Sequence, residues 1–203
     1  MRLYFSPGAC SLAPHIVLRE LGGHFDLDLV DLKAKKTAED KDFTAINPKG
    51  YVPVLQLDDH QILTEGPAIM QYLADRAPEK GLVPPAGTMA RYRLVEAMNF
   101  ISSEIHKTFT PLFKDGTPEE TRQAYREILS KRVSIVAAQL ETSSHIVGDH
   151  FTIADAYLFT TLSWARYVDF DLEPWPAVVA YLARIAQRPS VHEAMAAEGL
   201  VKE

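Results

Sequence analysis

Residues 2–31 read RLYFSPGACSLAPHIVLRELGGHFDLDLVD, and this stretch decides the fold of the N-terminal part of the chain. Residues 2–5 form a short apolar run typical of a strand, and the apolar residues of positions 11–21 recur at helical spacing. The glycine pair at 22–23 ends this helix, and residues 25–31 alternate, which predicts a half-buried strand. The side expected to face the core carries Phe25, Leu27 and Leu29. Strand, helix and strand in this order predict a βαβ unit with parallel strands.

The chain continues with shorter elements. Residues 37–45 are a weak helix candidate, and residues 53–57 and 61–64 predict two short strands around a turn. A Gly-Pro pair at 66–67 opens a last helix, because proline suits the first helical position. The predicted order β-α-β-α-β-β-α describes a small α/β domain over residues 1–77.

A different composition follows. The segment PEKGLVPPAGTMA (residues 78–90) holds three prolines and two glycines, which is typical of a linker. All later periodic segments have helical spacing, and helices are predicted at about 88–112, 118–142, 152–168, 175–187 and 190–197. The sequence therefore predicts an α/β domain over residues 1–77, a linker at 78–87 and an all-α domain over 88–203.

The overall composition of the 203 residues narrows the classes of function. Acidic residues number 27 against 21 basic ones, and this net charge of −6 disfavours a general nucleic-acid binder. No apolar run reaches the ~18 residues of a membrane helix, and no signal peptide is expected at the N-terminus. The single cysteine, Cys10, excludes an internal disulfide and a multi-cysteine zinc site. We expect a cytoplasmic protein with no bound metal.

Cys10 lies in the segment SPGACS (residues 6–11), between the first predicted strand and the first predicted helix. Unpaired N–H groups and the dipole at a helix N-terminus favour negative charge, so a lowered pKa is predicted for its thiol. No second cysteine is present to resolve a disulfide, which leaves a mixed disulfide with a small thiol or a hydrogen bond to that thiol. The alternative is a buried, inert cysteine, the common role of a lone cysteine.

Val52 precedes Pro53, and a residue before proline is pushed to an extended conformation. If the peptide bond between them is cis, the N–H and C=O of Val52 can turn outward and pair with the backbone of a bound peptide, as a further strand would. The alternative is an ordinary proline at the edge of a sheet.

The pair Glu65-Gly66 lies at the start of the next predicted helix. With Gly66 as the N-cap, the N–H groups of the first turn can hold a carboxylate, and Glu65 beside them can receive an ammonium group. The head group of an amino acid carries both charges, although an acid that merely serves the helix dipole is an equally good interpretation. Lys35 belongs to the run KAKK (residues 33–36), which is usually a solvated face rather than part of a site.

The predicted helix over 88–112 has two unlike faces. The apolar face is expected in the core and carries Leu94, Met98, Ile101, Ile105 and Phe109. The opposite face is polar but nearly uncharged and carries Asn99, Ser103, His106 and Thr110. Such a face suits a ligand or another protein surface, with His106 as a hydrogen-bond donor into an interdomain cleft; the alternative is an exposed helix face. Farther along, Thr152-Ile153-Ala154-Asp155 is a capping-box pattern, so Asp155 is interpreted as a cap.

Five segments in this order and spacing together resemble the cytosolic glutathione S-transferases, most closely the bacterial beta class. The segments are residues 6–12 (SPGACSL), 47–53 (NPKGYVP), 64–73 (TEGPAIMQYL), 104–113 (EIHKTFTPLF) and 151–159 (FTIADAYLF). The resemblance covers essentially the whole chain. It implies a thioredoxin-like N-terminal domain, an all-helical C-terminal domain, a homodimer and glutathione as co-substrate.

The resemblance also implies roles for single residues. Cys10 would face the glutathione sulfur or form a mixed disulfide with it, and Val52, ahead of a cis Pro53, would pair with the cysteinyl backbone. Glu65 and Gly66 would hold the γ-glutamyl head group. The other residues implied to contact glutathione are Lys35, which would meet a carboxylate, Ser103, Glu104 and His106, and Asn99, which would reach the ligand of a partner subunit. The electrophile pocket would be lined by Phe109, Phe113 and Trp164.

Two positions depart from the family pattern. Many transferase classes place a Tyr or Ser at the end of the first strand to stabilise the thiolate, whereas here Phe5 ends the strand and Tyr4 is expected to point to the opposite side. The common Glu/Gln-Ser pair at the head-group position is Glu65-Gly66, which lacks the hydroxyl but keeps the backbone N–H.

The function predicted from these features is a detoxifying transferase that conjugates the glutathione thiolate to small apolar electrophiles, with thiol-disulfide exchange through Cys10 as an added activity. The alternatives on the same scaffold are a glutathione-dependent oxidoreductase, isomerase or dehalogenase. A non-catalytic protein that binds a ligand or a partner is the alternative from a different class. Neither nucleic acid nor a membrane is expected as a partner.

Overall fold

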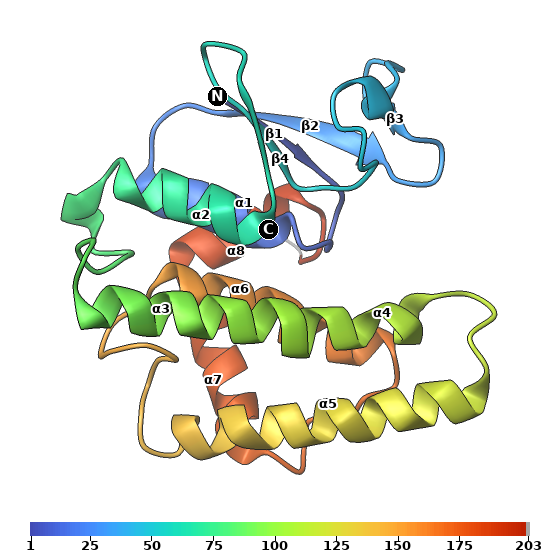
Figure 1. The fold of residues 1–203 in the computed structure, drawn as a ribbon, viewed down its shortest axis with the longest axis vertical. Coiled ribbons are helices and arrows are strands. Elements are labelled where there is room, and N and C mark those ends of the chain that lie inside the picture. Colours follow the sequence, from blue (N-terminus) through green and yellow to red (C-terminus); the bar gives the residue numbers. More distant parts are fainter. Residues whose placement is uncertain (202–203) are drawn as a thin grey trace. The chain divides into compact units, whose positions relative to one another are not determined.

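The computed structural model describes residues 1–201. They form two compact units, one of Met1–Val83 with the chain from Arg188 onward, and one of Pro84–Gln187. The first unit holds the sheet and the second is built from helices (Figure 1), which confirms the predicted fold class. The predicted all-α domain over 88–203 differs at its C-terminal end, because helix α8 (Pro189–Ala197) belongs to the first unit; its last residues, 202 and 203, lie outside the described residues.

The sheet of the first unit has the strand order β3-β2-β1-β4-β5. The strands are β1 (Arg2–Phe5), β2 (Asp26–Asp31), β3 (Lys36–Thr37), β4 (Val54–Gln56) and β5 (Ile62–Thr64). β1 and β2 are parallel and the other neighbouring strands are antiparallel, so the predicted βαβ unit is confirmed. The weak helix candidate at 37–45 is reduced to one 3-10 turn, Phe43–Ala45, and β3 was not predicted.

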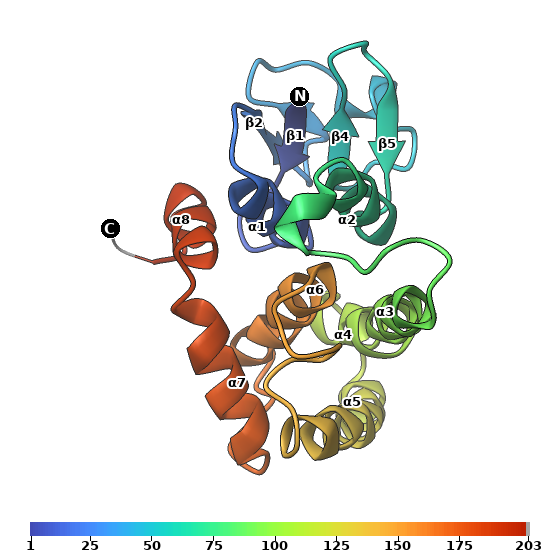
Figure 2. The ribbon, with the colours of Figure 1, turned by 90° about the vertical axis from the view of Figure 1, so that its left-hand side faces the viewer.

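Two helices, α1 (Leu12–Leu21) and α2 (Gly66–Asp75), pack against each other beside this sheet (Figure 2). Because successive side chains of a strand point to opposite faces, β1 places residues on both faces of the sheet. Phe5 lies near His15 of α1, with 6.2 Å between ring centroids, whereas Tyr4 points to the other face and lies 5.9 Å from the ring of Phe43. Tyr4 thus points away from Phe5, as expected, and its hydroxyl donates to Oε1 of Gln56 in the sheet at 3.2 Å.

The buried face of β2 differs from the predicted one. Of the three apolar residues expected to face inward, two are half-buried and Leu29 is 44% exposed, whereas Asp28 and Val30 are buried. The carboxylate of Asp28 tolerates this position because it accepts hydrogen bonds from Nη1 of Arg2 at 3.4 Å and from the N–H of Ala38 at 3.3 Å.

Buried polar contacts explain why α8 belongs to the first unit. Nδ1 of His15 lies 2.9 Å from Oε1 of Glu198, and both side chains are fully buried. The other carboxylate oxygen of Glu198 accepts from the backbone N–H of Gly8 at 2.9 Å. At the start of α8, Arg188 donates to Glu20 at 2.8 Å. Because buried polar groups need hydrogen-bond partners, these contacts tie the C-terminal segment to α1 and to the loop before it.

The second unit is a bundle around one central helix. Its elements are α3 (Met89–Phe100), a π-helical turn (Ile101–His106), α4 (Lys107–Phe113), α5 (Glu119–Leu140), α6 (Ile153–Leu162), a 3-10 turn (Ser163–Tyr167) and α7 (Pro176–Ala186). Every residue of α6 is buried, and α3, the π-helical turn and α7 contact it. Among the helices of residues 1–201, none combines the length and the apolarity of a membrane span.

Two sequence predictions for this unit are confirmed. The apolar face of the predicted helix over 88–112 is buried throughout, at Leu94, Met98, Ile101, Ile105 and Phe109. The capping box at α6 is present: Asp155 accepts from the N–H of Thr152 at 2.9 Å, and the hydroxyl of Thr152 accepts from the N–H of Ala154 at 3.3 Å. The π-helical turn interrupts the predicted helix without ending it, and such turns are frequent at functional sites.

Candidate active site

Cys10 stands two residues before α1, in a loop that closes on itself. The N-cap of α1 is Ser11, whose hydroxyl accepts from the N–H of Ser6 and donates to its carbonyl, both at 3.2 Å. The thiol of Cys10 donates to the carbonyl of Val52 at 3.3 Å, and the side chain remains partly exposed. Cys10 is therefore a half-buried residue that lies beside the backbone of the segment before β4.

The prediction of a lowered pKa for Cys10 is wrong. Burial is the main cause that raises the pKa of this thiol to about 12, and the charge of Glu65 acts in the same direction. The backbone N–H groups of Cys10 and Ser11 lower the pKa, as expected at a helix N-terminus, but by less. At neutral pH the Cys10 side chain is consequently a neutral thiol and a hydrogen-bond donor.

The Val52–Pro53 peptide bond is cis, as the resemblance implied. Val52 itself is buried, and its carbonyl accepts from Cys10. Pro53 borders the start of α2, because a Cβ placed on Gly66 would lie 3.7 Å from the ring carbon Cγ of Pro53. This segment thus touches both the Cys10 loop and the helix start that was expected to hold a head group.

The start of α2 differs by one residue from the prediction. The N-cap is Glu65, with a positive φ of 69°, and Gly66 is the first helical residue rather than the cap. A positive φ is unfavourable for a residue with a Cβ and is found where the surroundings impose it. The carboxylate of Glu65 accepts from Nζ of Lys49 at 2.5 Å and from the hydroxyl of Tyr51 at 2.9 Å. This carboxylate is therefore placed to receive cationic and hydroxyl donors.

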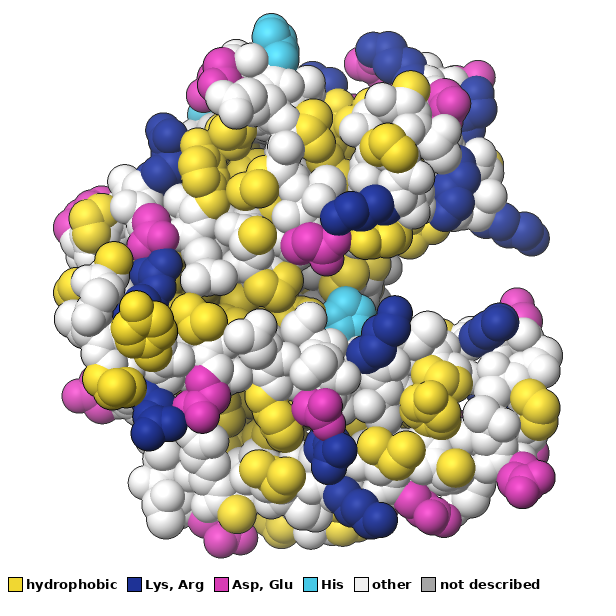
Figure 3. Space-filling model, viewed as in Figure 1, with side chains coloured by type: hydrophobic (Ala, Val, Ile, Leu, Met, Phe, Trp, Pro, Cys, Tyr) yellow, Lys and Arg dark blue, Asp and Glu magenta, His cyan; other side chains and the backbone are white. Residues whose placement is uncertain are grey.

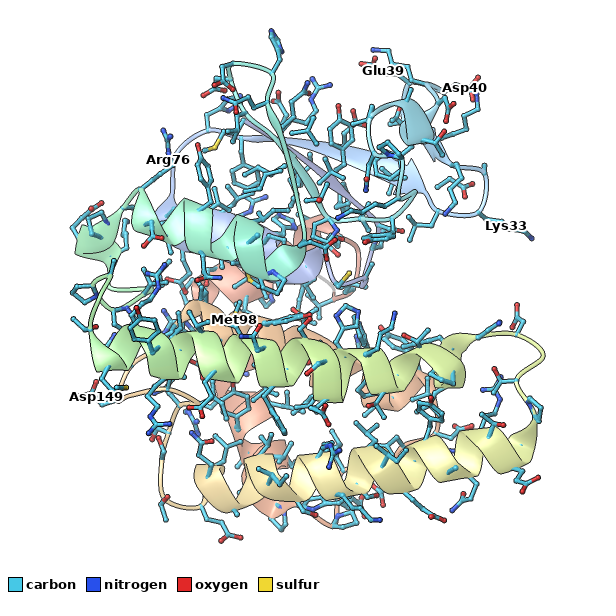
Figure 4. All side chains as sticks on the ribbon, in the orientation of Figure 1. Lys33, Glu39, Asp40, Arg76, Met98 and Asp149 are labelled. Atoms are coloured by element: carbon cyan, nitrogen blue, oxygen red, sulfur yellow. The ribbon has the colours of Figure 1, made fainter. Side chains whose placement is uncertain are left out.

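Sequence reasoning missed Lys49 and Tyr51, although both lie in the segment NPKGYVP (residues 47–53) that carried the resemblance. The segment is held by Asn47, which is buried and donates to the carbonyl of Tyr51 at 2.7 Å. Lys35 donates to the carbonyl of Gly50 at 2.6 Å. Lys33 of the same basic run points into solvent (Figure 4), so only part of that run is a solvated face.

The predicted site residues of the first unit therefore meet around one segment. Residues 47–53 contact Cys10 through Val52, the start of α2 through Pro53, the Glu65 carboxylate through Lys49 and Tyr51, and Lys35 through Gly50. These contacts bring together a thiol, a carboxylate, an ammonium group and the first turn of a helix. An extended peptide with charged ends would find complementary groups there.

In the second unit, His106 is held by two aromatic residues. Its Nδ1 lies 2.7 Å from the hydroxyl of Tyr157, and its ring lies 4.8 Å from that of Trp164. Glu104 accepts from Nε of Arg132 at 2.7 Å. Tyr157 was not predicted as a site residue, because no sequence pattern indicates that α6 faces the π-helical turn.

The other predicted residues of this unit fall into two groups. Ser103 is exposed and its hydroxyl donates to the carbonyl of Asn99 at 3.0 Å, one turn earlier on the same polar face. The rings of Phe109 and Phe113 lie 5.6 and 5.8 Å from Trp164, and Phe113 is 46% exposed. The three residues expected to line the electrophile pocket thus form one aromatic cluster with a solvent-exposed edge.

Among residues 1–201, no three or more His, Cys, Asp or Glu side chains come together as a metal site would require. On the face shown in Figure 3, basic and acidic side chains are intermixed.

Comparison with known families agrees with this geometry. Residues 8–76 match the model of the glutathione S-transferase N-terminal domain, and residues 100–189 match that of the C-terminal domain. The glutathione S-transferase GstA of Escherichia coli O157:H7 is 50% identical over 200 residues, 98% of this chain and 100% of that protein. This chain belongs to the glutathione S-transferase family. The glutathione S-transferase GST-4.5 of Xanthomonas campestris is a more distant relative, 37% identical over 98% of this chain and 100% of its own length.

Solved structures of related transferases extend the comparison. A ternary complex of BphK, described as a bacterial glutathione S-transferase, has a TM-score of 0.97 and 52% identity over 98% of this chain and 100% of its own. A sphingomonad glutathione S-transferase in complex with glutathione has a TM-score of 0.96 and 46% identity, over 99% and 100% of the two chains. A beta-class transferase of Sphingomonas chungbukensis is equally similar, which confirms the resemblance to that class. The chain is a transferase, and it conjugates glutathione.

Proposed function

We propose that glutathione binds this transferase as an extended peptide along residues 47–53, with its sulfur beside Cys10, and that the bound thiolate attacks small apolar electrophiles. The observation that carries the proposal is the hydrogen bond from the Cys10 thiol to the Val52 carbonyl, at 3.3 Å. It joins the only cysteine of the chain to the backbone group that would pair with a bound peptide.

The first unit offers partners for the charged ends of glutathione. The Glu65 carboxylate already accepts from the Lys49 ammonium at 2.5 Å, and the γ-glutamyl ammonium would take an equivalent place. The γ-glutamyl carboxylate would lie at the N-terminus of α2, at the N–H of Gly66, where the helix dipole favours negative charge. Lys35, whose ammonium donates to the Gly50 carbonyl, would meet the second carboxylate.

The chemical task of the site is to favour the glutathione thiolate over the thiol. Cys10 is suited to this as a neutral donor, because its raised pKa of about 12 keeps the proton on its own sulfur at neutral pH. A hydrogen bond from Cys10 to the bound sulfur stabilises the anion without transferring a proton. Each unit by which the bound thiol's pKa falls corresponds to about 1.4 kcal/mol of preferential thiolate stabilisation.

We propose that the helical unit completes the site. Ser103, Glu104 and His106 would contact the same glutathione, and the cluster of Phe109, Phe113 and Trp164 would line an apolar electrophile pocket. The protein would act as a cytoplasmic homodimer in detoxification, with Asn99 reaching the ligand of the partner subunit. Exposure of Asn99 and Phe113 and the aromatic ring contacts support these roles.

Thiol-disulfide exchange through Cys10 ranks below conjugation. The thiolate is the reactive form of a cysteine in exchange. With a pKa of about 12, roughly one Cys10 side chain in 10⁵ is ionised at pH 7. The same geometry that makes Cys10 a donor therefore makes it a poor nucleophile in the ligand-free protein.

The test combines a titration with one substitution. Ultraviolet absorbance of the bound thiolate should titrate at a pKa well below that of free glutathione, and S-methylglutathione, which has no thiol, should give no signal. Cys10→Ala should raise the pKa of the bound thiol by about one unit and lower kcat by about tenfold, because one hydrogen bond to a charged group is lost. A bound thiol with the pKa of free glutathione contradicts the proposal.

A further inference from the structure

Tyr157 and His106 form a pair inside the helical unit. Tyr157 belongs to α6 and is only 2% exposed, and its hydroxyl lies 2.7 Å from Nδ1 of His106. The two rings meet edge to face, at 84° and with 5.8 Å between their centroids. The contact joins residues 51 positions apart, so it depends on the packing of α6 against the π-helical turn.

Both partners of this pair are held in place. Every residue of α6 is buried, and the helix begins at a capping box whose Asp155 also accepts from the hydroxyl of Tyr181 at 3.0 Å. His106 ends the π-helical turn, and the ring of Trp164 packs edge to face on it at 4.8 Å. A histidine packed between two aromatic rings has one preferred ring orientation, and its hydrogen bond at Nδ1 decides where the ring proton resides.

The direction of the hydrogen bond follows from acidity. A phenol ionises at a pKa of about 10, whereas the N–H of a neutral imidazole is a far weaker acid, and an imidazole nitrogen accepts a hydrogen bond more strongly than a phenol oxygen. For the neutral ring, this difference in acidity favours the hydroxyl of Tyr157 as the donor and Nδ1 of His106 as the acceptor. Because Nδ1 accepts, the single proton of the neutral ring is on Nε2.

We propose that Tyr157 is a positioning residue that holds His106 as the Nε2–H tautomer, which makes His106 a hydrogen-bond donor to the glutathione thiolate and not a base. The inference rests on the proposed contact of His106 with bound glutathione. In this arrangement the Nε2–H group donates to the sulfur and keeps its proton. The thiol proton leaves to solvent, since Nε2 already carries a proton and has no lone pair to accept another.

The first measurement reads the tautomer directly in the unmodified protein. In ¹⁵N-labelled protein at a pH where His106 is neutral, long-range ring spectra should show Nδ1 as the unprotonated nitrogen and Nε2 as the protonated one. The signals of His106 are assigned as those absent from the His106→Asn variant. A wild-type spectrum with the proton on Nδ1 overturns the proposal, and this reading depends on no variant at position 157.

The second measurement removes only the hydroxyl. In Tyr157→Phe the Nδ1 resonance of His106 should shift, kcat with a chlorodinitrobenzene electrophile should fall about three- to tenfold, and its pH profile should move upward by about half to one unit. The KM for glutathione should stay within about twofold, because the lost interaction acts on the thiolate rather than on peptide binding. A purely structural role for Tyr157 would leave the ring resonance and the pH profile in place.

A matched control is available in the first unit. Tyr4→Phe removes the same atom from another buried tyrosine, whose hydroxyl donates to Gln56 at 3.2 Å. It should leave the His106 resonances and the pH profile unchanged. An unchanged Nδ1 resonance and pH profile in Tyr157→Phe overturn the proposal. If His106→Asn leaves conjugation unchanged, the proposed role of His106 at glutathione fails, and the spectrum of the wild type still decides whether Tyr157 fixes the tautomer.

Discussion

In the first unit the residues proposed to bind glutathione stand in loops, whereas in the second unit those proposed to act on its sulfur stand on helices packed around α6. The loops offer backbone groups and unusual conformations, such as the cis bond before Pro53 and the positive φ of Glu65. The helices offer side chains held by other side chains, as His106 is held by Tyr157. The first unit thus offers loops of unusual conformation, with Cys10 among their side chains, and the second offers side chains fixed by packing.

The largest effect expected from this contrast concerns Cys10, where the helix terminus lowers the pKa of the thiol and burial raises it. Because its pKa is raised to about 12, the thiolate fraction and the rate of alkylation by iodoacetamide should rise about tenfold per pH unit, roughly a thousandfold from pH 7 to 10, without a plateau. The same protein in denaturant is the control, and its rate should level off near pH 9, the ordinary range of a thiol. A plateau between pH 7 and 8 in the native protein would show that the helix terminus dominates.

The next largest effect tests whether the packing of the second unit depends on the start of α6. Asp155→Ala removes the acceptor of the N–H groups of Ile146 and Thr152 and of the hydroxyl of Thr152. It leaves the buried hydroxyl of Tyr181 with only the backbone carbonyl of residue 155. We expect a loss of about 3–5 kcal/mol in the free energy of unfolding, measured by urea denaturation. Asp171→Ala, which removes an exposed carboxylate from the N–H of Glu173, is the control and should cost under about 1 kcal/mol. Similar losses in both variants would contradict the assigned role of Asp155.

The smallest effect concerns the loops of the first unit. Glu65→Gln keeps the shape of the side chain but removes the charge that would meet the γ-glutamyl ammonium. The KM for glutathione should rise about tenfold, with kcat changed less than about twofold, because binding energy is lost equally in the ground and transition states. Glu39→Gln, an exposed acid paired with Lys41 in the same unit, is the control and should change neither constant. An unchanged KM in Glu65→Gln would place the head group elsewhere.

The loops of the first unit were largely predictable from the sequence, because the residue patterns that predict them are local. The cis bond before Pro53 was implied by the family resemblance, and the start of α2 was placed within one residue by the Gly-Pro pair. The face of β2 was not predictable in this way. The burial of Asp28 depends on Arg2, 26 residues away, and alternation of apolar residues alone does not reveal such a partner.

The remaining errors share the same physical origin. The pKa of Cys10 follows from desolvation, which depends on the packing of the whole loop and not on its distance from a helix terminus. The assignment of α8 to the first unit follows from the pairing of Glu198 with His15 across 183 positions. A role for Tyr157 was not predicted, because a tyrosine in an apolar helix is normally part of the core. Only the structure shows His106 at its hydroxyl.

The hydrogen bond from the N–H of Gly8 to the carboxylate of Glu198 has a consequence for biosynthesis. The carboxylate that secures the cysteine loop is added by the ribosome 190 residues after the glycine that it holds. A nascent chain that has already exposed its first strands and helices lacks this hydrogen bond until residue 198 has been synthesised. The turn that carries Cys10 therefore gains this contact only after the helices α1 to α8 have all been synthesised.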